Sequence, residues 1–158
     1  MKKEQIGDFT RRISQCNRSG LVVIMYDIFF AYLDDAKAAY ETEAWDDYKE
    51  ALRGGERALR ELISSLNFSY DMAKNLYSIY VFCQDSLAKS MYKRDLTDMA
   101  HARRLMEKLY DGFVHAAMQD TSEPLMKNTQ QVYAGYTYGR DNLVETCQDS
   151  DISRGFFA

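Results

Sequence analysis

The stretch that decides the fold is Asn75 to Asp95, with the sequence NLYSIYVFCQDSLAKSMYKRD. Apolar and small residues recur in it every three or four positions, namely Leu76, Ile79, Tyr80, Cys83, Leu87, Ser90 and Met91. The polar residues fall largely between them, at Gln84, Asp85, Lys89 and Lys93. This spacing predicts a helix that buries one face.

Three other stretches show the same periodicity, over residues 21–36, 45–66 and 96–117. Pro124 is the only proline, so no proline interrupts these stretches. Short connections make consecutive helices antiparallel. The sequence therefore predicts an all-α fold, an antiparallel four-helix bundle over residues 17–120. Candidate N-caps are Asn17 or Ser19, Ser69 or Asp71, and Asp95.

Two further segments flank the predicted bundle. In residues 1–16, Ile6, Phe9 and Ile13 are spaced like one face of a short helix, which predicts a docking segment. Residues 121–158 are rich in tyrosine and glycine and lack helical periodicity. We expect them to form an irregular, flexible C-terminal tail.

The composition excludes several classes of function. The formal net charge of −4 argues against a nucleic-acid partner, which needs a basic surface. Three widely spaced cysteines indicate neither a disulfide framework nor a zinc site. No apolar run is long enough for a signal peptide or a membrane span. We therefore expect a cytoplasmic protein that does not insert into membranes.

Residues with catalytic or metal-binding patterns are missing. His101 and His115 would lie about 21 Å apart on one helix, too far to share a metal ion. Cys83 falls on an apolar helix face, where a cysteine usually serves as a small core residue. Phosphate-binding loops and the hydrolase nucleophile motif do not occur. The sequence predicts neither an enzyme nor a protein with a metal or another cofactor.

Binding is the function class that remains. Eight methionines and 13% aromatic residues favour recognition of an amphipathic helix, although each also fills a core. Gly54 and Gly55 lie within a predicted helix, where each costs about 1 kcal/mol relative to alanine. They indicate close approach of a cargo helix, close packing of a neighbouring helix in the bundle, or a tolerated kink.

The order of several motifs resembles the FliS family of flagellin export chaperones. These motifs are Leu21-x-x-x-Met25-Tyr26-Asp27, Leu59-x-x-Leu62-Ile63-x-x-Leu66-Asn67-Phe68, Asn75-Leu76-x-x-x-Tyr80 and Lys93-x-Asp95. The resemblance covers roughly residues 6–118. Such chaperones usually begin the first long helix with Ser-Pro and follow Tyr-Asp with Gly, whereas this chain has Ser19-Gly20 and Ile28. A groove near Tyr26 is therefore expected to differ in shape.

The resemblance implies a cytosolic chaperone that holds the disordered C-terminal segment of flagellin and presents it to a component of the flagellar type III export gate. Within it, we expect a cargo groove or its supporting wall to include Met25, Tyr26, Phe29, Leu76, Tyr80, Cys83 and Leu87. We also expect a self-capping segment that occupies part of this groove until flagellin displaces it, formed by Ile6, Phe9 and Ile13. The alternative is a generic helical adaptor for another amphipathic cargo.

Overall fold

The computed structural model describes residues 3–126. This part of the chain contains five α-helices and no strand: α1 (Lys3–Gln15), α2 (Arg18–Glu41), α3 (Trp45–Ser64), α4 (Asp71–Lys93) and α5 (Thr97–Gln119). The predicted all-α fold is therefore confirmed. From residue 127 onward the predicted tail lies outside the described residues.

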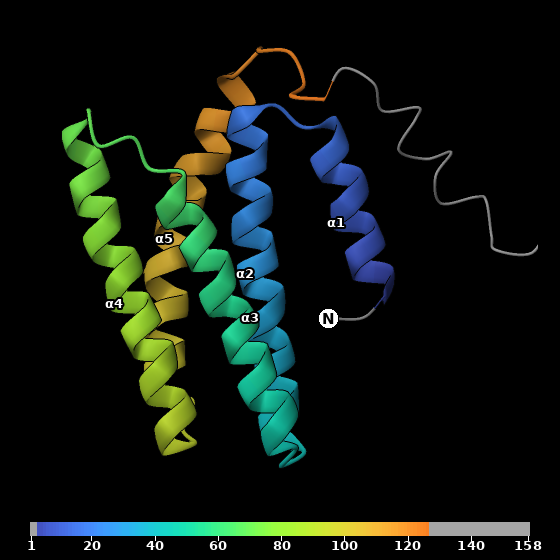
Figure 1. Ribbon diagram of the computed structural model, residues 1–158, viewed down its shortest axis with the longest axis vertical. Coiled ribbons are helices and arrows are strands. Elements are labelled where there is room, and N and C mark those ends of the chain that lie inside the picture. The colour runs from blue at the N-terminus through green and yellow to red at the C-terminus, as the bar shows by residue number, and fades with distance from the viewer. Residues whose placement is uncertain (1–2, 127–158) are drawn as a thin grey trace, which may run out of the picture. The chain divides into compact units, whose positions relative to one another are not determined.

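Helices α2 to α5 form the bundle (Figure 1). Helix α2 packs against α3 and α5, and α4 packs against the same two helices, so that the four helices close a ring. The connections span only residues 42–44, 65–70 and 94–96, which makes consecutive helices antiparallel. Helix α1 lies outside this ring and packs against α2.

The helix starts agree only in part with the predicted caps. Asn17 caps α2, because its Oδ1 accepts a hydrogen bond from the Gly20 N–H at 2.9 Å. At α4, the prediction of Ser69 or Asp71 is wrong: Tyr70 occupies the cap position, and no side chain caps the helix. At α5, Leu96 rather than Asp95 occupies the cap position, although Asp95 accepts a hydrogen bond from the Thr97 N–H at 3.2 Å.

The core lies inside the ring and includes residues from all four helices, among them Phe29, Leu52, Leu87 and Met106. Gly54 and Gly55 are buried in α3. A Cβ atom at Gly54 would lie 2.3 Å from the ring of Tyr32, and one at Gly55 would lie 3.2 Å from Leu87 Cδ1. The paired glycines thus let α3 pack closely against neighbouring helices, which is the second of the alternatives drawn from the sequence.

Candidate binding cleft

An apolar cleft opens where α3 ends and α4 begins. Its volume is about 240 Å³, and α2 and α5 complete its walls. The residues that line it are mostly apolar: Val22, Leu62, Ser65, Leu66, Asn67, Tyr70, Met72, Ala73, Leu76, Tyr80 and Phe113. Such a concave, mainly apolar site with a few polar groups is suited to receive an apolar side chain of a partner.

Large apolar side chains are also exposed in the connection before α4 and along α4 itself. They are Phe68, Tyr70, Met72, Tyr77, Val81 and Phe82. Among them, Tyr70 and Met72 line the cleft, whereas Phe82 lines a different groove between α4 and α5. Phe68 and Tyr77 pack edge to face, with ring centroids 5.9 Å apart. Exposed apolar residues that gather in one region indicate an interaction surface, whereas scattered ones are ordinary. The cleft and these six residues together form the candidate site, which we call the α4 surface.

The floor beneath the α4 surface is buried and uncharged. Tyr80 lines the cleft, is 1% exposed, and shares a hydrogen bond of 2.8 Å with the hydroxyl group of Tyr26. Burial raises the pKa of both phenols above 10, and at Tyr26 the hydrogen bond with Tyr80 raises it further. Both groups stay neutral near pH 7. Tyr26 also packs against Phe113, with ring centroids 5.4 Å apart.

The seven residues predicted for the cargo groove are placed at different depths. Five of them are fully buried in the core, namely Tyr26, Phe29, Tyr80, Cys83 and Leu87. Met25 and Leu76 are partly buried and pack against that core. Only Leu76 and Tyr80 line the cleft. The buried residues can support a wall, but in this conformation they do not offer a surface to a cargo.

The sequence reasoning did not single out most of the α4 surface. None of its six exposed residues belongs to the predicted groove, namely Phe68, Tyr70, Met72, Tyr77, Val81 and Phe82. The signal for them was an excess of apolar residues: the stretch from 68 to 82 carries more of them than one buried helix face requires. Helical periodicity identifies only the buried face, so it does not identify apolar residues that lie outside that face.

The predicted self-capping segment lies on α1, away from the α4 surface. Ile6 is 49% exposed, whereas Phe9 and Ile13 are partly buried. No residue of α1 lines the cleft. In this structure the segment therefore does not cover the cleft. It covers part of α2 instead, and whether flagellin displaces it there stays a prediction.

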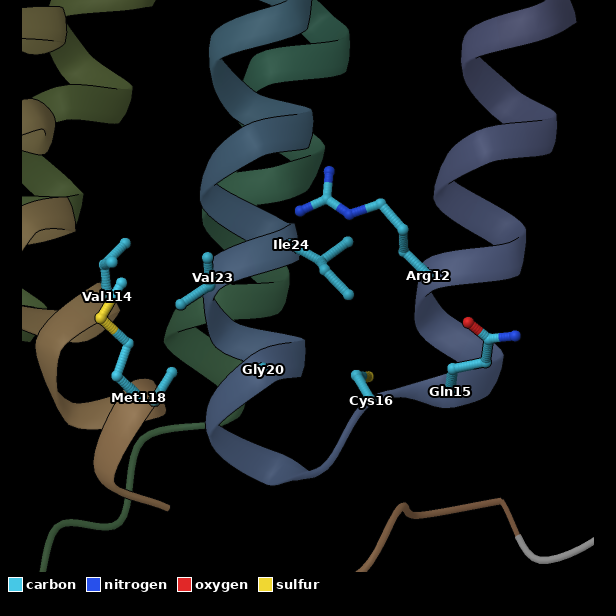
Figure 2. Close-up of a pocket in the computed structure, with 9 residues that line it drawn as sticks. Arg12, Gln15, Cys16, Gly20, Val23, Ile24, Val114 and Met118 are labelled. Atoms are coloured by element: carbon cyan, nitrogen blue, oxygen red, sulfur yellow. The ribbon is translucent and has the colours of Figure 1, made fainter. Parts of the chain in front are cut away.

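A second groove lies between α1, α2 and α5, with a volume of about 410 Å³. Figure 2 shows Arg12, Gln15 and Cys16 on one side of it, facing Val23 and Ile24 of α2 and Val114 and Met118 of α5. The guanidinium group of Arg12 pairs with the carboxylate of Asp27, which also accepts a hydrogen bond from the hydroxyl of Tyr110 at 2.8 Å. Asp27 therefore links α1, α2 and α5.

Two features of the described residues bear on catalysis, namely the state of the Cys83 thiol and the placement of groups that bind metal ions. Burial raises the pKa of the Cys83 thiol to about 12, which opposes formation of a thiolate. Among residues 3–126, no cluster of three or more histidine, cysteine or acidic residues is able to hold a metal ion. No helix in that part of the chain has the length and apolar character needed to cross a membrane.

Fold and site together define a helical binding protein whose bundle presents an apolar cleft. A family model described as flagellar protein FliS matches residues 3–120, which is most of the chain, and the chain therefore belongs to the FliS family. This family has a chaperone role in flagellum biogenesis, with flagellin as its general partner, and it is not a known enzyme family. A search of curated proteins gave no significant match.

Proposed function

We propose that this protein is a cytosolic chaperone that holds the disordered C-terminal segment of flagellin, prevents premature polymerisation and aids delivery to the flagellar type III export apparatus. The observation that carries the proposal is the α4 surface, an apolar cleft bordered by exposed aromatic residues at one end of the bundle. Delivery to the export apparatus includes contact with a component of the export gate.

The proposed cargo fits the chemistry of the α4 surface. An amphipathic segment folds into a helix and places apolar side chains at i, i+3, i+4 and i+7 against an apolar groove. The cleft receives one such anchor, and Tyr77, Val81 and Phe82 contact the next turns. Ordering a disordered segment costs roughly 2–5 kcal/mol of the gross interaction energy. Because this cost lowers the net affinity, the complex protects the cargo and still releases it.

We further propose that α1 shields a second part of the cargo path on α2. Phe9 and Ile13 are partly buried on α1, and Arg12 holds the helix to Asp27. Because α1 packs mainly on α2 and leaves Ile6 exposed, a longer apolar segment is able to replace it. In the bound state, the cargo would then cover apolar residues of α2 that α1 covers in the free protein.

A binding experiment with two forms of flagellin tests the proposed function. The full-length chaperone is mixed with monomeric flagellin or with flagellin that lacks its C-terminal segment, and the complexes are separated by size-exclusion chromatography. The proposal predicts a complex with full-length flagellin only. Equal retention of the truncated form contradicts the proposed cargo segment. Binding of neither form favours the alternative, a helical adaptor for another cargo.

A matched pair of variants tests the shielding role of α1. Arg12→Ala removes the ion pair with Asp27, whereas Arg11→Ala removes a pair with Asp8 inside α1 itself. We expect Arg12→Ala, and a folded truncation lacking residues 1–16, to bind flagellin more tightly, by about twofold to fivefold for the point variant. Arg11→Ala should leave the affinity unchanged. Unchanged or weaker binding by the folded truncation contradicts this part of the proposal.

A further inference from the structure

The chain leaves α5 and crosses to the junction between α1 and α2 (Figure 1, orange). We call residues 120–126 the strap. The Leu125 N–H donates a hydrogen bond of 2.9 Å to the carbonyl oxygen of Cys16, which lies between α1 and α2. Residues separated by more than a hundred positions in the sequence thus meet at the link between α1 and α2.

Side chains of the junction strengthen this contact. Asn17 Nδ2 donates to the carbonyl oxygens of Asp120 at 3.0 Å and Ser122 at 3.4 Å. Ser19 Oγ donates to Asp120 Oδ2 at 2.5 Å. The hydrogen bond from Ser19, together with those from Ser122, lowers the pKa of Asp120 to about 2, so the acceptor is a carboxylate at any working pH. Such charge-assisted hydrogen bonds are stronger than neutral ones.

The contact lies where it restrains the movement of α1 relative to α2. Only Cys16 and Asn17 separate α1 from α2, so any swing of α1 must change the backbone angles of these two residues. That change turns the Cys16 carbonyl away from Leu125 and shifts the Asn17 side chain. A helix as short as α1 is marginal by itself and depends on its tertiary contacts. The strap therefore opposes release of α1.

We propose that the strap is a clamp that sets how readily α1 leaves α2, so that the segment following α5 controls access to the surface that α1 covers. Its effect on α1 stands without any cargo. Its regulatory consequence rests on the proposed displacement of α1 by flagellin. By linkage, whatever holds the strap in place also holds α1, and release of either loosens the other.

Two substitutions open the clamp without disturbing the helix cap or the core. Asn17→Asp keeps an oxygen that accepts from the Gly20 N–H, but it removes the donor to Asp120 and Ser122. Leu125→Pro removes the N–H that binds the Cys16 carbonyl. Leu125→Ala is the matched control, because it shortens the same side chain and keeps the N–H.

The experiment is hydrogen–deuterium exchange of the full chain without cargo, read at the amides of α1. We expect exchange about tenfold faster in Asn17→Asp and in Leu125→Pro, and within twofold of the original chain in Leu125→Ala, with α3 and α4 unchanged as a check on folding. Unchanged α1 exchange in both clamp variants overturns the proposal. The affinity of the same variants for flagellin is measured separately. Faster exchange with unchanged affinity supports the clamp and contradicts the shielding role of α1 instead.

Discussion

The two faces of α4 are apolar for different reasons. The inner face places Tyr80, Cys83 and Leu87 in the core, where none is more than 1% exposed. The outer face carries Tyr77, Val81 and Phe82, which are 44%, 39% and 48% exposed. A bundle helix needs only one apolar stripe to be stable. The outer residues therefore indicate binding. Variants on the inner face should mainly change the free energy of unfolding, whereas variants on the outer face should mainly change the affinity for cargo.

The inner face should give the largest effect on stability. Leu87→Ala removes a fully buried side chain that packs beside Gly55, and we expect a loss of about 2–5 kcal/mol in the free energy of unfolding. Urea denaturation followed by circular dichroism measures this loss. A loss below 1 kcal/mol would show that the inner face is less tightly packed than its burial indicates.

Alkaline pH should destabilise the core next, through Cys83 on the inner face of α4 and Tyr48 on α3. Burial raises the pKa of Cys83 from 9.0 to about 12, and burial likewise raises that of Tyr48 from 10.0 to about 12. Because each group ionises first in the unfolded chain, its stabilisation is lost by about 1.4 kcal/mol per pH unit as the pH rises, from 9 toward 12 for Cys83 and from 10 toward 12 for Tyr48. Urea denaturation at pH 8 to 11 measures the slope. In Cys83→Ala the free energy of unfolding should fall less steeply between pH 9 and 10. An equal slope would show that ionisation of Cys83 does not cause the loss.

The buried hydroxyl pair should give a smaller effect, with a distinct signature. Tyr80→Phe leaves the hydroxyl of Tyr26 without its partner, and we expect a loss of about 1–3 kcal/mol. The double variant Tyr26→Phe with Tyr80→Phe removes both polar groups and should recover part of that loss. Thermal unfolding of the four forms completes the cycle. Additive losses would show that the two hydroxyls do not interact.

The outer face should affect binding more than stability. Tyr77→Ser removes an aromatic ring that packs on Phe68, and we expect flagellin to bind about tenfold more weakly, a change of about 1.4 kcal/mol. The control is Tyr92→Ser, which makes the same substitution on α4 at a tyrosine that is 91% exposed and lies near the other end of the helix. Isothermal titration calorimetry compares them. Equal losses for both variants would contradict the location of the site.

The sequence predicted the helices better than the surface. Periodicity located α4 almost to its ends because burial of Tyr80, Cys83 and Leu87 determines the pattern. It did not distinguish core from groove, since the same apolar residue serves either purpose and only the packing of α2, α3 and α5 decides. The contact between Leu125 and Cys16 was beyond prediction, because backbone hydrogen bonds between distant segments leave no mark in the sequence.

The most direct test of the central claim is hydrogen–deuterium exchange of the full chain with and without the isolated C-terminal segment of flagellin. The claim is that the α4 surface receives this segment. It predicts that added protection is concentrated in residues 66–82, with a smaller response at the junction of α1 and α2. Protection confined to the opposite end of the bundle, around residues 42–47 and 94–97, would contradict it.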